Sequence, residues 1–196
     1  MHRLNSLIDL EKLSERLWGH SSQDRSAMNI LKATWLETPL GPMVAISDDE
    51  SLYLLEFFDR KGLSAEIEYL VKKKGAHIIS ATAPPLVSIK EELKAYFNGS
   101  LKKFETPFSL RGTDFQKLAW NALTEIPYGE TRSYMQQAEA VNRSAAHRAV
   151  ANANGANQLA IIIPCHRIIN ANGQLGGYGA GLARKKWLIE HERRHQ

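Results

Sequence analysis

The spacing of apolar residues changes from a strand-like to a helix-like pattern near residue 110 of this 196-residue chain. Three β-rich segments come first, ILKATWLET, MVAIS and SLYLLEFF, with turn signals at residues 39–42 and 48–50 between them. They predict an antiparallel meander, which is followed by helices over 63–75 and 84–99 and a return strand at 77–81. Residues 30–100 therefore predict a small structural α/β domain with an antiparallel sheet.

Helical spacing dominates after the polar stretch 99–112, in TDFQKLAWNALTEI, TRSYMQQAEAV, AAHRAVANANG and LARKKWLIEHERR. The second and third of these segments are short and are joined by about three residues, which is the outline of a helix-turn-helix. The predicted fold class is therefore α/β (α+β), with the α/β domain followed by a mostly helical domain over residues 111–194. Apolar spacing also predicts a short helix over residues 6–18 in an N-terminal extension, residues 1–29.

Cys165 is the only cysteine. An intramolecular disulfide and a multi-thiolate metal site are therefore excluded, and we expect neither a metal nor a cofactor. The longest apolar runs, such as LAIIIP, are too short to cross a bilayer. Asp9 and Glu11 interrupt the stretch in which a secretory signal needs an apolar region, so we expect a cytoplasmic protein with no membrane partner.

Positive charge is concentrated in the half of the chain that holds Cys165. Residues 1–110 contain 14 basic and 15 acidic side chains, whereas residues 111–196 contain 11 basic and 6 acidic ones. This excess suits binding to a polyanion, although many basic proteins bind no nucleic acid. The alanine-rich helix predicted over 145–155 could approach a DNA groove closely or could simply be packed. Composition alone leaves DNA binding open.

The chemistry around Cys165 also permits two interpretations. Pro164 ends an apolar run that predicts a buried strand with the thiol at its mouth, and His166 and Arg167 supply positive potential that favours thiolate. Adjacent residues of a strand point to opposite faces, so contact between the thiol and His166 needs a tight turn or a bridging water. Either Glu190 or Glu192 could orient the imidazole. A lone cysteine is more often inert packing, and spacing does not choose between the two carboxylates.

Four motifs together resemble a known family. PCHRIIN, GYGAGLARKKWLIEHE, PYGETRSYMQQAEAVNRSAAHRAVANANGANQLAIII and FQKLAW resemble the methylated-DNA-protein-cysteine methyltransferases, also called O6-alkylguanine-DNA alkyltransferases. The resemblance is close over residues 111–194, and residues 30–100 look like the variable N-terminal domain of the same proteins. It implies DNA repair by direct reversal, in which a monomer moves one alkyl group from O6-methylguanine, or O4-methylthymine, in double-stranded DNA to its own cysteine.

The resemblance also assigns residues to this single-turnover S-methyltransferase reaction. Cys165 matches the acceptor, His166 the base that acts on the thiol through a water, and Glu192 the carboxylate that orients the base. Asn157 matches the asparagine that braces the turn before the active-site strand. Tyr134 matches the tyrosine beside the flipped base, whose hydroxyl can protonate the departing guanine.

The DNA contacts implied by the resemblance lie in the helix-turn-helix, which the family places in the minor groove. Arg148 matches the arginine that fills the gap left by the flipped base, and Arg143 and Ala149 belong to the same DNA-binding segment. The residues that match the loop and strand around the base are Ile168, through its carbonyl, Tyr178 and Gly179. Many relatives have serine at the position of Gly179, so a hydroxyl contact there is absent.

Three alternatives to repair make different predictions. A thiol hydrolase with Cys165, His166 and Glu192 would turn over repeatedly. A helix-turn-helix regulator would bind DNA sequence-selectively, with the cysteine as packing. Non-catalytic alkyltransferase-like proteins have tryptophan at the acceptor position, where this chain has Cys165.

Overall fold

The computed structural model describes residues 29–196. The helix predicted over residues 6–18 lies outside the described residues. The chain forms two compact units, and they are described separately. The first contains the described residues up to Glu91 together with Thr106–Ser109, and the second contains Glu92–Glu105 and Leu110–Gln196. The domain limits 30–100 and 111–194 remain predictions.

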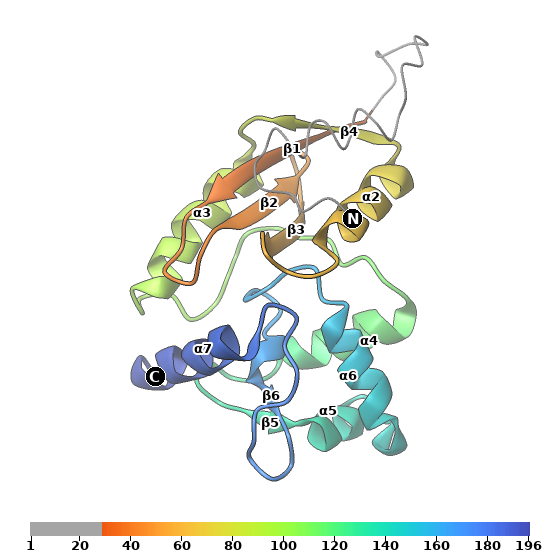
Figure 1. Cartoon of the computed structure of the whole chain (residues 1–196), viewed down its shortest axis with the longest axis vertical. Coiled ribbons are helices and arrows are strands. Elements are labelled where there is room, and N and C mark those ends of the chain that lie inside the picture. The colour runs from red at the N-terminus through yellow and green to blue at the C-terminus, as the bar shows by residue number, and fades with distance from the viewer. Residues whose placement is uncertain (1–28) are drawn as a thin grey trace. The chain divides into compact units, whose positions relative to one another are not determined.

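The first unit is built on a four-stranded sheet with the strand order β3-β2-β1-β4. Its elements, shown in Figure 1, are β1 (Asn29–Leu36), β2 (Met43–Ser47), β3 (Leu52–Phe57), α2 (Leu63–Lys74), β4 (Ala76–Ser80) and the start of α3 (Pro84–Phe97). The first three strands are antiparallel neighbours, with Thr34 opposite Ala45 and Ala45 opposite Leu55. The predicted meander is confirmed.

Strand β4 differs from the predicted antiparallel sheet, because it pairs with β1 in parallel. Helix α2 connects β3 to β4, and a strand reached through such a crossover runs in the direction of the strand that preceded the helix. Since β1 and β3 are each antiparallel to β2, they share that direction, and β4 is therefore parallel to β1. Alternate strand residues such as Val44 and Ile46 form one core cluster with Ile67 and Val71 of α2.

The second unit is mostly helical. Its elements are α4 (Asp114–Thr124), β5 (Arg132–Ser133), α5 (Tyr134–Ala140), the 3₁₀ turn η2 (Ser144–Ala146), α6 (His147–Gly155), the 3₁₀ turn η3 (Cys165–Arg167), β6 (Ile168–Ile169) and α7 (Leu182–Arg194). The final turns of α3, from Glu92, also belong to this unit. Capping boxes begin α4, at Thr113 and Gln116, and α5, at Ser133 and Gln136.

Helices α5 and α6 form the predicted helix-turn-helix, which is confirmed. Small side chains pack its core against α4, among them Ala119, Ala138 and Ala153. Two buried amides also join the helices, because Gln137 and Asn154 exchange hydrogen bonds of 2.9 and 2.7 Å. The pair fixes the end of α6, from which the chain continues toward Cys165. Within residues 29–196, no helix is both long and apolar enough to cross a membrane.

The apolar run before Cys165 is not the predicted strand. Ile161 has a φ of 73°, and the backbone N–H groups of Ile162 and Ile163 donate to the carbonyls of Ala160 and Leu159. A β-branched residue with positive φ marks a tight, strained turn. The prediction that the thiol lies at the mouth of a buried strand is therefore wrong. Cys165 follows this turn and begins the 3₁₀ turn η3.

Candidate active site

Asn157 fixes the surroundings of the half-buried Cys165 thiol. Its side-chain Nδ2 lies 3.3 Å from Sγ of Cys165 and 2.9 Å from the carbonyl oxygen of Ile163, while Oδ1 accepts from the backbone N–H of Leu159. The buried amide therefore holds the strained turn and directs an N–H toward the sulfur at the same time. A hydrogen bond of this kind favours thiolate over thiol.

His166 follows the thiol in the 3₁₀ turn and is fully buried. Its Nε2 lies 2.8 Å from Oε1 of Glu192. A ring nitrogen facing a carboxylate carries the proton, so Nδ1 is the free acceptor of the neutral ring. In the part of the chain that the structure describes, Nδ1 is buried and has no hydrogen-bond partner. Of the two alternatives that the sequence left open, a tight turn or a bridging water, the structure has the turn, because Cys165 and His166 lie in the same 3₁₀ turn.

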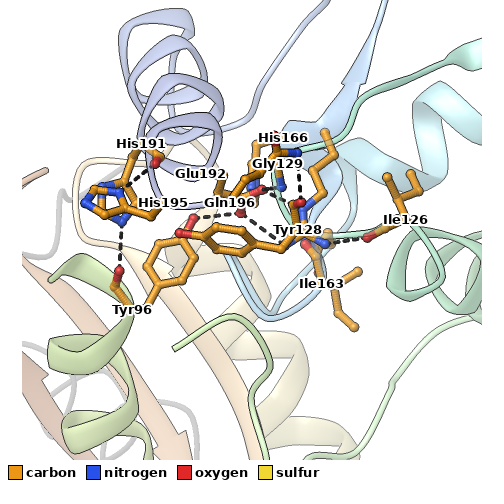
Figure 2. Close-up of polar contacts among 12 residues, drawn as sticks. Tyr96, Ile126, Tyr128, Gly129, Ile163, His166, His191, Glu192, His195 and Gln196 are labelled. Carbon is orange, nitrogen blue, oxygen red and sulfur yellow. Dashed lines mark hydrogen bonds and ion pairs between the residues drawn. The ribbon is translucent and has the colours of Figure 1, made fainter. Parts of the chain in front are cut away.

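Glu192 accepts hydrogen bonds from three parts of the second unit that are separated in sequence: α3, the loop at Gly129 and η3 (Figure 2). Its Oε1 accepts from His166 Nε2, from the Tyr96 hydroxyl at 2.8 Å and from Arg167 Nη2 at 3.1 Å. Its Oε2 accepts from Arg167 Nε at 2.8 Å and from the backbone N–H of Gly129 at 3.1 Å. The carboxylate is 1% exposed. Such a set of donors compensates for its removal from water.

The electrostatics of this pair favour an ionised carboxylate beside a neutral imidazole. Burial alone would raise the pKa of Glu192, but attraction and hydrogen bonds from His166 and Arg167 outweigh it and hold that pKa well below its ordinary range. Burial lowers the pKa of His166, and the neighbouring charge of Glu192 only partly opposes the effect. Near neutral pH, His166 is therefore uncharged and able to accept a proton.

Tyr134 lies at the start of α5, close to the loop that precedes α7. Its hydroxyl is 3.5 Å from the carbonyl oxygen of Gly177, a weak contact. A Cβ atom on Gly176 would meet the Tyr134 ring and hydroxyl at 2.7 Å, so the loop approaches the ring as closely as only glycine allows. Burial, and then the charge of Cys165, raise the pKa of Tyr134, which keeps its hydroxyl protonated.

The other predicted site residues lie on the loop, on β6 and on the helix-turn-helix. Tyr178 is half-buried and Gly179 is exposed, whereas Ile168 is buried opposite Arg132. Three further residues, Arg143, Arg148 and Ala149, are all exposed on η2 and α6 or beside them. They are accessible on the surface of the helix-turn-helix.

Of the two carboxylates that the sequence left open, only one reaches His166. Glu190 is exposed and pairs with Lys186 at 3.8 Å along α7, whereas Glu192 points inward. The structure therefore brings Cys165 and Asn157 into contact on one side of the turn, and His166 and Glu192 on the other.

Comparison with known proteins matches both units to one family. Residues 31–110 match the ribonuclease-like domain of 6-O-methylguanine DNA methyltransferase, and residues 114–194 match its DNA binding domain. The methylated-DNA–protein-cysteine methyltransferase of Methanosarcina barkeri is 39% identical over 80% of this chain and 94% of its own length. That of Shigella flexneri is 40% identical over 80% and 92%. The chain belongs to the methylated-DNA–protein-cysteine methyltransferase family.

The fold agrees with this membership. A crystal structure of the Mycobacterium tuberculosis OGT in complex with DNA is similar with a TM-score of 0.72 and 36% identity, over 85% of this chain and 94% of that one. The expected family and fold class are confirmed by these matches.

From the sequence, one residue of this methyltransferase-family site was assigned a different role and two others were not found. Arg167 was expected to favour the thiolate, but its guanidinium is directed at Glu192 and at the carbonyl oxygen of Ile126, 2.6 Å from Nη1. Tyr96 reaches Glu192 from α3, and no local pattern connects positions 96 residues apart. The other residue that was not found is Lys185.

Lys185 is a fully buried cation beside the loop. Its Nζ donates to the carbonyl oxygens of Gly176 and Gly177 at 3.2 and 3.1 Å. Burial lowers its pKa to about 8, while attraction to the Cys165 thiolate acts in the opposite direction. Helical spacing could have found this residue, because Lys185, Leu188 and Glu192 share one face of α7.

Proposed function

We propose that this protein repairs alkylated DNA by direct reversal, moving a methyl or other alkyl group from O6 of guanine, and from O4 of thymine, to Sγ of Cys165. The observation that carries the proposal is the Cys165 site itself. One half-buried thiol receives an amide N–H at 3.3 Å and is followed by a neutral, buried imidazole on an ionised carboxylate. Membership in the methyltransferase family supports the same reaction.

The first step is loss of the thiol proton. We assign this proton to Nδ1 of His166, directly or through one bridging water, because Nδ1 is the free acceptor of the ring. Glu192 holds the Nε2 proton in place and stabilises the imidazolium that forms. The thiolate that remains is stabilised by the hydrogen bond from the Asn157 amide and by the positive charge of Lys185.

The second step is displacement at the alkyl carbon. A new S–C bond forms on Cys165 as the C–O6 bond breaks, and the bonding electrons leave with the guanine. We assign the compensating proton to the Tyr134 hydroxyl, which stays protonated because burial raises its pKa. The phenolate then recovers a proton from His166 or solvent. The product is a thioether with no route to hydrolysis, so each chain reacts once.

DNA binding is assigned to the helix-turn-helix. Arg143, Arg148 and Ala149 are exposed on it, and residues 111–196 carry 11 basic against 6 acidic side chains. Flipping a base costs a few kcal/mol of stacking, which contacts to phosphates can offset. Arg148 would occupy the vacated stack, while Tyr178, Gly179 and the carbonyl of Ile168 would line the base. We also infer a monomer from the family resemblance. A free thiol nucleophile requires a reducing compartment, so we infer that the protein acts in the cytoplasm.

The decisive experiment counts methyl groups per chain. The protein is incubated with duplex DNA that carries O6-methylguanine labelled in the methyl group, and label on protein and on DNA is followed to completion. We expect one equivalent of label on the chain and restored guanine in the DNA. The Cys165→Ser variant should bind the duplex and remove no label. Label that stays on the DNA, or transfer by Cys165→Ser, would refute the proposal.

The same experiment separates repair from two of the other functions, the thiol hydrolase and the regulator. A thiol hydrolase would release label continuously instead of stopping at one equivalent. A helix-turn-helix regulator without catalysis would leave the label on the DNA even in the wild type, and it would prefer a particular sequence. Repair predicts weak sequence preference, because the lesion and not its neighbours is recognised.

A further inference from the structure

Two consecutive residues of α7 hold one residue of α3. The hydroxyl of Tyr96 donates to Oε1 of Glu192 at 2.8 Å, and the carbonyl oxygen of Tyr96 lies 2.7 Å from Nε2 of His191. The Tyr96 side chain is 1% exposed, and the His191 ring stacks on Trp187 with 4.7 Å between centroids. Figure 2 shows both contacts on either side of the Tyr96 ring. All of these residues belong to the second unit.

We propose that Tyr96 is a positioning residue for the reaction at Cys165, because its hydroxyl fixes Oε1 of Glu192 and limits how strongly that oxygen holds the Nε2 proton of His166. The inference rests on the proposed function, in which His166 accepts the thiol proton. Tyr96 itself touches neither the thiol nor the bound base in this mechanism. It acts on them through Glu192.

Three donors share Oε1 of Glu192. Oε1 accepts from His166, Tyr96 and Arg167, whereas Oε2 accepts from Arg167 and the backbone of Gly129. A hydroxyl donating to a carboxylate forms a charge-assisted bond, which draws negative charge toward the donor. When that donor is removed, more of the charge of Oε1 is available to His166, and the imidazolium form becomes more stable. Loss of the hydroxyl should therefore raise the pKa of His166.

The Tyr96 hydroxyl remains a donor over the whole working range of pH. Burial, followed by the negative charge of Glu192, raises the pKa of Tyr96 well above its ordinary value. The ring is fixed by neighbouring aromatic side chains, with Phe104 and Tyr128 at centroid distances of 5.5 and 6.1 Å. The charged and titratable groups that face the His166–Glu192 pair are Arg167, Lys185, Tyr96, Tyr128 and His191.

Tyr128 provides a matched control in the same ring cluster. Its hydroxyl is buried and, among the described residues, has no hydrogen-bond partner. Both tyrosines lie near the charge of Glu192, but only Tyr96 donates to it. Tyr128→Phe and Tyr96→Phe remove the same atom from the same neighbourhood, and only Tyr96→Phe removes a bond to the carboxylate.

The test titrates His166 by ¹⁵N NMR of the imidazole nitrogens in the wild type, Tyr96→Phe and Tyr128→Phe, and measures methyl transfer to Cys165 over the same pH range. We expect Tyr96→Phe to raise the pKa of His166 by roughly half a pH unit. Transfer should then slow about threefold on the acidic limb, and the rate on the alkaline plateau should stay within about twofold of the wild type. Tyr128→Phe should leave both curves unchanged.

A second replacement, which keeps the hydroxyl, distinguishes an effect of the hydrogen bond from a folding defect. With 3-fluorotyrosine at position 96, the ring keeps its size and becomes a stronger donor, so the pKa of His166 should move downward. A uniform loss of rate at every pH, or identical His166 titrations in all variants, would overturn the inference. Absence of methyl transfer in the wild type would instead overturn the proposed function, while the NMR titration would still decide the role of Tyr96.

Discussion

Oε1 of Glu192 lies 2.8 Å from Nε2 of His166, and both side chains are excluded from solvent. Arg167 holds Oε2 of the same carboxylate at 2.8 Å. This arrangement buries one negative charge with one positive charge and leaves the imidazole neutral between the carboxylate and the thiol. Removing any member therefore alters the stability of the fold together with its chemistry.

His166 and Glu192 should make the protein sensitive to acid. The pKa of His166 in the folded protein lies below 6.5, so the unfolded chain takes up a proton first as the pH falls. Stability should therefore decrease as the pH drops from 6.5 toward the folded pKa. The folded pKa of Glu192 lies well below 4.5, so its contribution is complete above 4.5 and is lost as pH falls toward the folded value. Urea unfolding between about pH 3 and pH 8 should show both losses.

The Glu192→Gln variant should lack the decrease in stability below pH 4.5. At neutral pH the variant should unfold more easily by about 3 kcal/mol, because Arg167 keeps a buried charge without a counterion. Glu190→Gln is the matched control, since it neutralises an exposed carboxylate two positions earlier on α7. An unchanged slope of stability against pH below 4.5 in Glu192→Gln would contradict the assignment.

Lys185→Met should raise the pKa of the Cys165 thiol. The buried ammonium is attracted to the thiolate, and removing an attractive opposite charge shifts a pKa by about one unit. Because Cys165 is the only cysteine, alkylation by iodoacetamide as a function of pH reports this thiol alone. Lys186→Met, which removes an exposed neighbouring cation, should leave the alkylation curve in place. Coincident curves for the wild type and Lys185→Met would refute the prediction.

Gly176→Ala should impair methyl transfer by displacing Tyr134. The added Cβ would lie 2.7 Å from the Tyr134 ring and hydroxyl, too close for either to stay in place. Gly177→Ala is the natural control, because a Cβ there meets nothing within 4 Å. We expect a loss of at least about tenfold in transfer rate for Gly176→Ala alone, since misplacing a proton donor costs this much or more. Equal rates for the two variants would mean that the contact is unimportant.

Most secondary structure could be predicted from local patterns, whereas the apolar run before Cys165 could not. The capped helices α4 and α5 carry their start signals at Thr113 and Ser133, so sequence alone locates them. Residues 159–163 are as apolar as a buried strand, but Ile161 takes positive φ within a tight turn. Asn157 supplies the side-chain bonds that hold this turn, and nothing local announces them.

The site, too, could be predicted only where its residues are close together in the sequence or match the family motifs. The neighbours Cys165 and His166 were evident, and resemblance to the family indicated Glu192 over Glu190. The partners that decide the charge of Glu192 come from far along the chain, in Tyr96 and Gly129, and depend on tertiary packing. Arg167 was assigned to the thiol because it is adjacent in sequence, but the 3₁₀ turn directs it to the carboxylate.

The buried amide pair of the helix-turn-helix should show strong energetic coupling. Gln137→Leu or Asn154→Leu alone leaves the other amide buried without its partner, which should cost about 1–3 kcal/mol of stability. The double variant replaces both with apolar groups and should recover much of that loss. Urea unfolding of the four proteins gives the coupling energy of the cycle. Additive losses would mean that the two amides stabilise the helices independently.

Arg148→Ala should separate DNA engagement from thiol chemistry. Arg148 is exposed on α6, so its loss should leave the buried side chains around the thiol unchanged. With methylated duplex DNA as substrate, the variant has nothing to fill the vacated stack, and transfer should fall by about tenfold or more. With the free base O6-methylguanine, no stack is opened, so its rate should stay within about twofold of the wild type.

Lys103→Ala tests whether this effect is specific to position 148. It removes an exposed cation outside the helix-turn-helix and should weaken duplex repair only slightly. Raising the salt concentration should slow duplex repair by the wild type and by both variants, because phosphate contacts remain in each. Equal losses on duplex and on free base in Arg148→Ala would place the defect in the thiol site and would contradict the role of Arg148 in holding the opened stack.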